Sequence, residues 1–226
     1  MVLLTTLIVY LLAAPAIADK DDAFFVDKRD FRKSYKTIAL TPIDSDPVLN
    51  MPASVASMIE AEITKHLERR GFTVLPSSVL GDIRASMTKQ IGGVTYPDSD
   101  QTDPARLQIM RGHASRELWF KHKPDVLASV RVRVTRGAAA SDRVEWHGVT
   151  QKMQSKGRGN YSARVPVSSV TVVMVDQTDN LLYAYDGGLE VLMRREKDQF
   201  LPLPAESYFQ DEKRIRKAAN VAVDPI

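Results

Sequence analysis

The chain has 226 residues, 44% of them hydrophobic, and a formal net charge of +3 at pH 7. This length suffices for one domain with a substantial core, and the mild charge, with Lys and Arg mixed among Asp and Glu, argues against a nucleic-acid binder. Because the chain has no cysteine, disulfides, thiol catalysis and thiolate metal sites are excluded.

Residues 1–18 predict a secretory signal peptide. Val2 to Pro15 is apolar apart from two threonines and one tyrosine, and it carries no charge. Ala16-Ile17-Ala18 has the small-x-small pattern of a cleavage site, and a charged stretch follows from Asp19. The apolar core is short for a membrane span, but no Lys or Arg precedes it, so an uncleaved anchor is the alternative. With no lipid-accepting cysteine, we expect a periplasmic protein cleaved after Ala18 and not a lipoprotein.

Residues 19–35 form a charged segment that contains Phe24, Phe25 and Phe31. We expect this lead-in segment to pack its aromatic side chains on the domain; a partner-binding peptide is the alternative. Residues 36–226 are then predicted to fold as a single domain.

The first part of that domain reads as strand, helix, strand. Residues 37–43 are short and apolar, which is typical of a buried strand. The helix is expected to begin with Asn50 as its N-cap and Pro52 at its first position, and to end at Gly71 in a left-handed conformation. Its apolar stripe consists of Val55, Met58, Ile59, Ile63 and Leu67. A second strand at 72–75 would pair in parallel with the first through a right-handed crossover.

Two further helices follow. The first spans about 77–91, capped by Ser77 or Ser78 and ended by two glycines. The second starts at Asp103-Pro104, which supply an N-cap and a first-turn proline, and ends before Pro124. Residues 94–103 between them are polar and rich in turn formers, which indicates a surface loop.

From residue 125 the apolar period changes from helical to two. Residues 126–135 predict a half-buried strand, 137–142 a turn, 143–153 its hairpin partner, and 154–161 a loop. Strands at 165–175 and 181–185 flank the turn 176–180. Gly187-Gly188 interrupts the second of these strands, and 189–194 is either its continuation after a bulge or a separate strand. Residues 201–204 are expected to be a crossing segment, and Asp211 to cap a last helix through about Ala222. The fold class is therefore α+β: a two-layer domain with a mixed sheet, β-α-β-α-α and then an antiparallel meander and a C-terminal helix.

No catalytic, cofactor or metal motif emerges. The four histidines, His66, His113, His122 and His147, lack ligand spacing, so solvated or capping roles are favoured. Asp176, Asp179 and Asn180 suit a hairpin turn better than a cation-binding loop. Neither Ser77 nor Ser168 and Ser169 lie in a nucleophile motif, and Gly157 and Gly159 lie in a loop between strands and not in a phosphate-binding turn.

Five cations are candidates for contact with an anionic surface. Arg131 and Arg133 line one face of a strand, and Lys213, Arg216 and Lys217 cluster on the last helix. Charge at such positions is ordinarily solvation, and the functional alternative is weak contact with anionic lipid or acidic glycan.

Three local patterns resemble a family of envelope α+β domains that includes the amino-terminal domain of TolB, the curli-export lipoprotein and the lipoprotein activators of penicillin-binding proteins. They are KTIALTPID followed by a helix and ERRGFTVLP, then KPDVLASVRVRV, then VTVVMVDQTDNLLYAYDGG. The resemblance spans about Lys36 to Met193. The chain departs from it by lacking the lipobox cysteine and by carrying Asn180 where glycine is common. The resemblance implies a non-enzymatic binding or scaffolding role in the envelope.

The expected function is therefore that of a periplasmic binding or scaffold protein that docks to another envelope protein, without a cofactor and without nucleic acid. Two alternatives stay open. A carrier of a lipid or other apolar ligand would need an enclosed apolar pocket under the meander. An envelope hydrolase would use an acid pair or a metal that one sequence does not reveal, and two carboxylates brought together in an apolar cleft would favour it.

Overall fold

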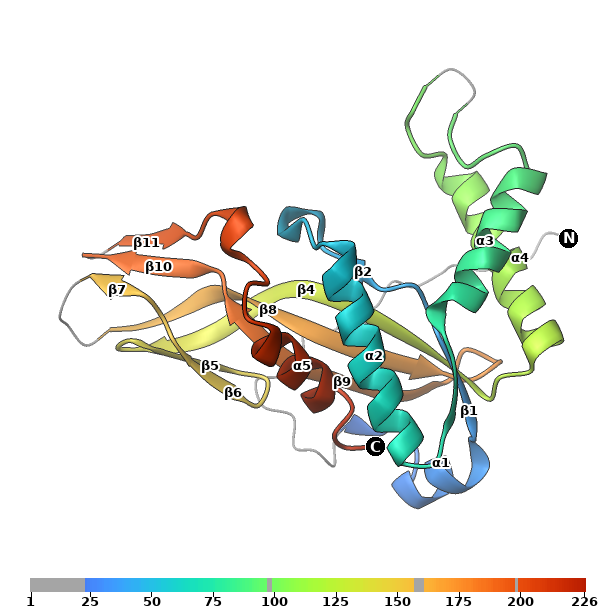
Figure 1. Cartoon of the computed structure of the whole chain (residues 1–226), viewed down its shortest axis with the longest axis horizontal. Helices are drawn as coiled ribbons and strands as arrows, with labels where there is room; N and C mark the ends of the chain where they lie inside the picture. The colour runs from blue at the N-terminus through green and yellow to red at the C-terminus, as the bar shows by residue number, and fades with distance from the viewer. Residues whose placement is uncertain (1–22, 97–98, 157–160, 198) are drawn as a thin grey trace, which may run out of the picture.

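The computed structural model describes residues 23–96, 99–156, 161–197 and 199–226. The predicted signal peptide and Gly157 and Gly159 lie outside these residues. Within them the chain folds as an α+β structure with a mixed sheet and helices packed on it (Figure 1). The helices are α1 (Lys28–Ser34), α2 (Ala53–Arg69), α3 (Ser77–Gln90), α4 (Pro104–His122) and α5 (Glu212–Val221). The strands are β1 (Thr37–Leu40), β2 (Asp44–Ser45), β3 (Thr73–Leu75), β4 (Val126–Ala140), β5 (Arg143–Trp146), β6 (Val149–Lys152), β7 (Ser155–Lys156), β8 (Ser162–Val175), β9 (Leu181–Val191), β10 (Met193–Glu196) and β11 (Gln199–Pro202).

The sheet is built on the long antiparallel pair β4 and β8. At one end β1 pairs in parallel with β3, as the strand–helix–strand pattern predicts, and it also pairs in parallel with the start of β4. At the other end β5 pairs with the last residues of β4, and β6 pairs with β5. Strand β9 runs antiparallel to β8 on its free side. One strand pair therefore connects a helix-covered end to an all-β end.

The predicted turn at 137–142 is wrong for its first half, because β4 continues to Ala140 and the chain turns at Ser141 and Asp142. Gly137 is a strand residue at the place where the sheet curls, and a Cβ there would meet Val144 at 2.6 Å and Val167 at 3.0 Å. The glycine permits this close approach and does not mark a turn. The predicted single strand 143–153 is likewise two strands, β5 and β6, joined at His147 and Gly148.

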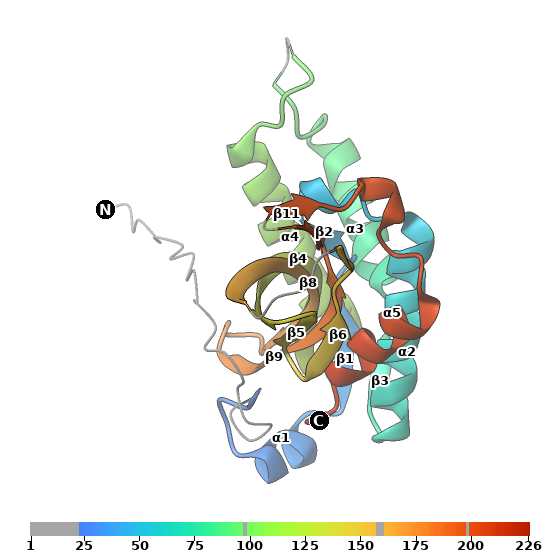
Figure 2. The ribbon, with the colours of Figure 1, turned by 90° about the vertical axis from the view of Figure 1, so that its left-hand side faces the viewer.

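The β end closes on itself around a small core of its own. Gly188 of β9 donates its N–H to the carbonyl of His147 at 3.1 Å, which brings the β5–β6 hairpin against β9. The resulting curl is visible in Figure 2. Its interior holds a cluster of buried side chains: Ala139, Val144, Trp146, Val149, Met153, Val165, Val167 and Val191.

The principal core lies between the sheet and the helices α2 and α5. The stripe predicted on α2 is buried at Val55, Ile59, Ile63 and Leu67, with Met58 partly so. On the sheet side it meets Val126, Ala128, Val130 and Val132, alternate residues of the strand that the sequence predicts to be half-buried. Helix α1 belongs to this core as well, because Phe31 is fully buried beside Phe24, Tyr35 and Phe72. The lead-in segment thus packs its aromatic side chains as expected, except for the exposed Phe25.

Two predicted helix caps are wrong. Asn50 has φ +44° and ends a short 3₁₀ turn, so α2 begins at Ala53 with Pro52 at the N-cap position. Neither Ser77 nor Ser78 caps α3; Glu60 of α2 instead accepts from the backbone N and the hydroxyl of Ser77 at 2.8 and 2.6 Å. A carboxylate from a neighbouring helix replaces the local cap, which sequence spacing does not reveal.

The other predicted caps are confirmed. Asp103 accepts hydrogen bonds from the backbone N–H groups of Ala105 and Arg106, and Pro104 occupies the first turn of α4. Asp211 accepts a hydrogen bond from the backbone N–H of Arg214 at the start of α5. Gly71, at φ +89°, follows α2 in the left-handed conformation. Ile215 and Ala219 of α5 and Ala222, which follows it, are buried.

Helices α3 and α4 form an arm that projects from the sheet (Figures 1 and 2). They pack on each other through a third cluster: Leu80, Ile83, Met110, Ala114 and Leu118, with Ala39 of β1 at the base. Because only the base of the arm meets the sheet, most of α4 has one face against α3 and the opposite face toward solvent.

The segment after β8 forms a strand with a bulge, β9, and then two strands of a second sheet, β10 and β11. Strand β9 continues through Gly187 and Gly188, with a register shift opposite Ser168 and Ser169. Of the predicted segment 189–194, residues 189–191 are therefore a continuation after a bulge, whereas Met193 and Arg194 belong to the separate strand β10. Residues 201–204, expected to be a crossing segment, instead lie partly in β11. That strand pairs with β10, which also contacts β7.

Candidate interaction surfaces

The five cations predicted to meet an anionic surface do not form one patch. Arg131 pairs with Asp46 at 2.9 Å and Arg133 with Asp186 at 2.7 Å, both on the sheet face opposite the principal core. The other three lie on α5, on the helix-covered side, and of these Arg216 pairs with Glu62 of α2 at 2.5 Å. The two strand arginines are therefore neutralised locally. Of the five cations, Lys213 and Lys217 alone form no ion pair with a carboxylate of the described residues.

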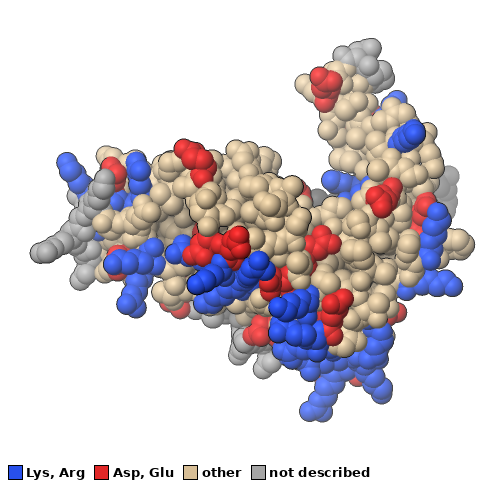
Figure 3. Space-filling model, in the orientation of Figure 1, with Lys and Arg blue, Asp and Glu red and all other residues tan. Residues whose placement is uncertain are grey.

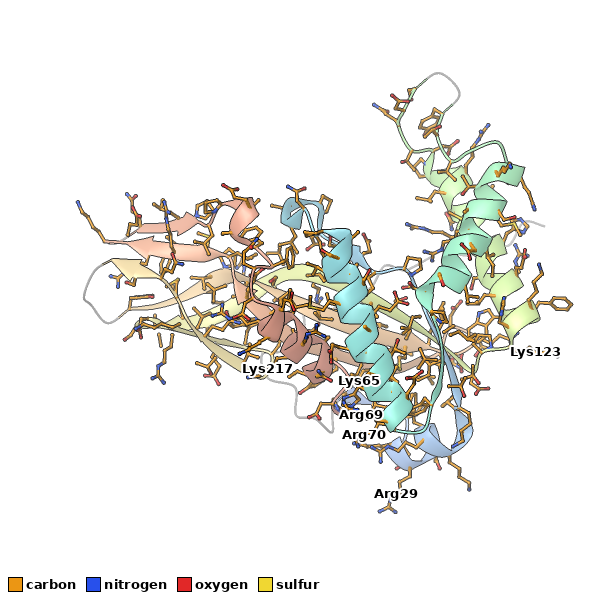
Figure 4. All side chains as sticks on the ribbon, viewed as in Figure 1. Arg29, Lys65, Arg69, Arg70, Lys123 and Lys217 are labelled. Carbon is orange, nitrogen blue, oxygen red and sulfur yellow. The ribbon has the colours of Figure 1, made fainter. Side chains whose placement is uncertain are left out.

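A different set of cations lies together. We define the basic band as Arg29 of α1, Lys65 and Arg69 of α2, Arg70 at the end of α2, and Lys217 of α5. All five side chains are exposed, and within the described part of the chain none forms an ion pair with a carboxylate. Figure 4 shows them following one another from α5 across the end of α2 to α1, and Figure 3 shows the same region as a concentration of Lys and Arg.

A small hollow lies at the α5 end of this band. It has a volume of about 230 Å³ and is lined by β6, β9 and α5, including Gln151, Leu189, Arg214 and Lys217. Gln151 spans the gap between β6 and β9 by donating to the carbonyl of Leu189 at 2.5 Å. The hollow is open, mostly polar and much smaller than an acyl-chain pocket, so it does not favour an apolar-ligand carrier.

Glu190 follows Leu189, one of the residues that line the hollow. Its side chain is largely buried and accepts a hydrogen bond from the backbone N–H of Phe209 at 3.1 Å. Burial raises the pKa of Glu190 to about 7, against the opposing effects of the Phe209 hydrogen bond and of Arg214. In the unfolded chain the pKa is near that of an ordinary Glu. Between about pH 4.5 and 7 the folded state therefore binds more protons than the unfolded state, so stability falls as pH rises through this window.

Glu190→Gln is expected to remove this pH dependence. Urea unfolding of the wild type should show a loss of stability from pH 5 to pH 8, at most about 1.4 kcal/mol per pH unit from this one group. The Gln variant, which keeps a carbonyl acceptor for Phe209, should show a smaller loss and be relatively more stable at pH 8. Equal slopes for the two proteins would show that Glu190 does not titrate in this range.

One polar cluster has the composition of a hydrolase site. His147 Nδ1 lies 2.9 Å from Ser169 Oγ, and its Nε2 lies 3.6 Å from Asp186. Asp186 is engaged by Arg133 at 2.7 Å and by the hydroxyl of Thr171 at 2.5 Å. Burial and the Arg133 cation lower the pKa of His147, while Asp186 opposes this.

The surroundings of this cluster do not suit catalysis. Ser169 is fully buried in the middle of β8, so no substrate can reach its Oγ in this conformation. The carboxylate that would orient the imidazole is already occupied by Arg133 and Thr171, and it lies beyond hydrogen-bond distance of Nε2. The geometry instead ties the β5–β6 turn to β4, β8 and β9. The sequence does not reveal this cluster, because its members come from three strands and one turn that are far apart in the chain.

The other polar residues considered in the sequence analysis contribute to turns and to helix packing. Asp176 accepts hydrogen bonds from Thr178 and Asn180, which hold the predicted hairpin turn. His66 is buried between α2 and α5, and that burial lowers its pKa. Among the described residues there is no group of three potential metal ligands. In the same parts of the chain, none of the helices combines the length and apolar character needed to span a membrane.

Among the α-helices that the structure describes, the outer face of α4 carries the exposed large hydrophobic side chains, Ile109 and Phe120. We define it by Ile109, His113, Arg116 and Phe120, which recur at steps of four, three and four and are all exposed. Phe120 is 81% exposed and Ile109 is 53% exposed. This face points away from α3, which contacts the opposite stripe of α4. The apolar period of the sequence predicts the buried stripe of this helix and not its outer face.

No family model matches the chain, and no curated protein matches its sequence.

Proposed function

We propose that this protein is a non-enzymatic binding or scaffold protein of the bacterial cell envelope, and that the outer face of α4 docks on another envelope protein. The observation that carries the proposal is the exposure of Phe120 and Ile109 on a projecting helical arm. A large aromatic side chain that is 81% exposed contributes nothing to its own fold, whereas such side chains dominate the energy of protein interfaces.

The charges around this face indicate the chemistry of its partner. Arg116 belongs to the face, and among the described residues it forms no ion pair with a carboxylate. A partner with an apolar pocket bordered by carboxylates is therefore the best complement. The helix would enter it as a preformed element, using anchors at Ile109 and Phe120.

The envelope location rests on the sequence. The apolar stretch before Pro15 and the cleavage pattern at Ala18 support export to the periplasm, and the resemblance to envelope α+β domains supports a binding role. Mass spectrometry of the protein from fractionated cells should find Asp19 as the first residue. An intact Met1 on cytosolic material would contradict this location.

Ile109→Glu/Phe120→Glu is expected to abolish capture of the partner. The full chain, bearing an affinity tag, would be recovered from cross-linked envelopes in wild-type and variant form, and the partner identified from the wild-type sample. Recovery of that protein by the variant should fall about tenfold or more, because two anchors would become charged in an apolar contact. The variant should unfold at nearly the wild-type denaturant concentration, because both side chains are exposed.

Val48→Glu is the matched control. Val48 is 65% exposed and lies in the 3₁₀ turn before α2, away from the arm. This variant should recover the same partner as the wild type. Equal recovery by all three proteins, or no reproducible partner at all, would contradict docking through α4.

A further inference from the structure

The basic band lies on a different surface from the outer face of α4, and its composition needs an explanation of its own. Its five cations come from three helices that are far apart in sequence, yet Figure 4 places them in one continuous series. Exposed cations in proteins commonly pair with nearby carboxylates, as Arg131 and Arg216 do here. Within the described residues the band has no such pairs, so its charge is directed to solvent.

Nearby carboxylates only partly offset this charge. Glu62, beside the band on α2, is taken by Arg216 and also accepts from Asn220 at 3.2 Å. Its pKa is lowered chiefly by the Arg216 hydrogen bond, against the effect of burial, so it stays ionised and its charge is balanced. Asp27 at the N-cap of α1, Asp30 of α1 and Glu68 of α2 are exposed and reduce the net charge. The sum over the band and these three carboxylates is still positive.

Helix stability explains part of the band and not all of it. Cations near the C-terminus of a helix interact favourably with its macrodipole, which accounts for Lys65, Arg69 and Arg70. The same argument fails for Arg29, in the first turn of α1, where a cation is unfavourable. Lys217, in the middle of α5, gains nothing from it either. These two residues extend the positive surface in both directions without a benefit to the fold.

The arrangement suits an extended anionic surface. The cations lie on the outer sides of helices and not around a pocket, so they can meet many weakly held charges at once. The chain also reaches α1 directly from the apolar stretch before Ala18, with only residues 19–27 between. When the chain is exported across the inner membrane, the end of the domain that contains α1 would therefore lie close to the outer leaflet.

We propose that the basic band binds the phosphate headgroups of anionic phospholipids and holds the domain against a membrane surface, leaving the outer face of α4 free for its partner. Each Lys or Arg close to an anionic membrane strengthens binding about fivefold. Five such residues, less the three carboxylates, give an association that is reversible and sensitive to salt.

Vesicle co-sedimentation of the exported form, which begins at Asp19, tests this proposal. Vesicles of phosphatidylcholine with about 30% phosphatidylglycerol would be compared with vesicles of phosphatidylcholine alone. The wild type should bind the anionic vesicles about tenfold more tightly or better, and about 0.5 M NaCl should remove the difference.

Lys65→Glu/Arg69→Glu should lower binding to the anionic vesicles by more than about tenfold while leaving binding to neutral vesicles unchanged. Lys65→Gln/Arg69→Gln, which perturbs the end of α2 less, should give an intermediate loss. Lys123→Glu/Arg143→Glu changes the net charge equally, and it should retain most of the binding. Lys123 follows α4, as Figure 4 shows, and Arg143 is the first residue of β5, so both lie outside the band.

Three outcomes would overturn the proposal: equal binding to the two vesicle types, equal losses for the two Glu double variants, or retention on heparin without vesicle binding. The last would assign the band to an acidic polymer. None of these outcomes bears on docking through α4, which is tested separately by the Phe120 variant.

Discussion

Replacing Gly187 by alanine is expected to destabilise the fold by about 3 kcal/mol. A Cβ at this position would overlap the carbonyl oxygen of Ala218 in α5 and lie 2.9 Å from the backbone N of Ala222. Backbone atoms in a helix cannot rotate away as a side chain can, so α5 would have to move off β9. That movement would open the principal core, because Ile215, Ala218 and Ala219 are buried in this interface.

The matched control is Gly112→Ala. Gly112 lies inside α4, and a Cβ added there would meet nothing within 4 Å beyond its own helix backbone. Alanine at this position should therefore stabilise the protein by about 0.5–1 kcal/mol. Urea unfolding of both variants gives the comparison. If the free energy of unfolding of Gly187→Ala lay within about 0.5 kcal/mol of the wild-type value, α5 would not pack on β9 as closely as described.

Phe31→Ala is expected to cost about 3–5 kcal/mol. Phe31 is fully buried, and its ring lies 5.4 Å from that of Phe24 and 5.9 Å from that of Phe72, measured between centroids. Removing it would leave a cavity between α1 and the core. The result would show that the charged lead-in segment is an integral part of the domain.

Phe25→Ala tests the same segment without the cavity. Phe25 is 56% exposed, so its removal should change stability by less than about 0.5 kcal/mol. Chemical denaturation of the two variants, with one probe of secondary structure and one of tertiary packing, separates the effects. Similar costs for both, or no cost for Phe31→Ala, would mean that α1 does not dock on the core.

The elements that the sequence predicts well are those with a long apolar period or a local cap. The stripe of α2, the alternation along β4 and the capping by Asp103 and Asp211 are each properties of one segment. The α+β class follows from their order, and the structure shows it.

The features that the sequence does not reveal depend on contacts between distant segments. In the sequence, Gly137 looks like a turn residue. Its actual role is to let Val144 and Val167 of neighbouring strands come close, and this is apparent only when the strand pairing is known. The cap that Glu60 provides for α3 crosses between helices. Arg131 and Arg133 are candidates on the sequence, yet Asp46 and Asp186 come from other elements and neutralise them. The basic band is hidden for the same reason, since its members come from three helices.

The Ser169, His147 and Asp186 cluster illustrates why residue types alone do not assign an activity. Their proximity suggests a triad, but the serine is fully buried and the carboxylate is occupied by Arg133 and Thr171. A binding role accounts better for the exposed surfaces, in which one face offers cations and a projecting helix offers apolar anchors. Together they would place a partner at a fixed distance from a membrane.

Site-specific photo-crosslinking in living cells tests most directly whether the protein acts by contact. A photoreactive amino acid would replace Phe120 on the outer face of α4 or, as the control, Val48 beside α2. The account predicts one discrete adduct with a single envelope protein from position 120 and none from position 48. The same adducts from both positions, or none from either, would contradict it.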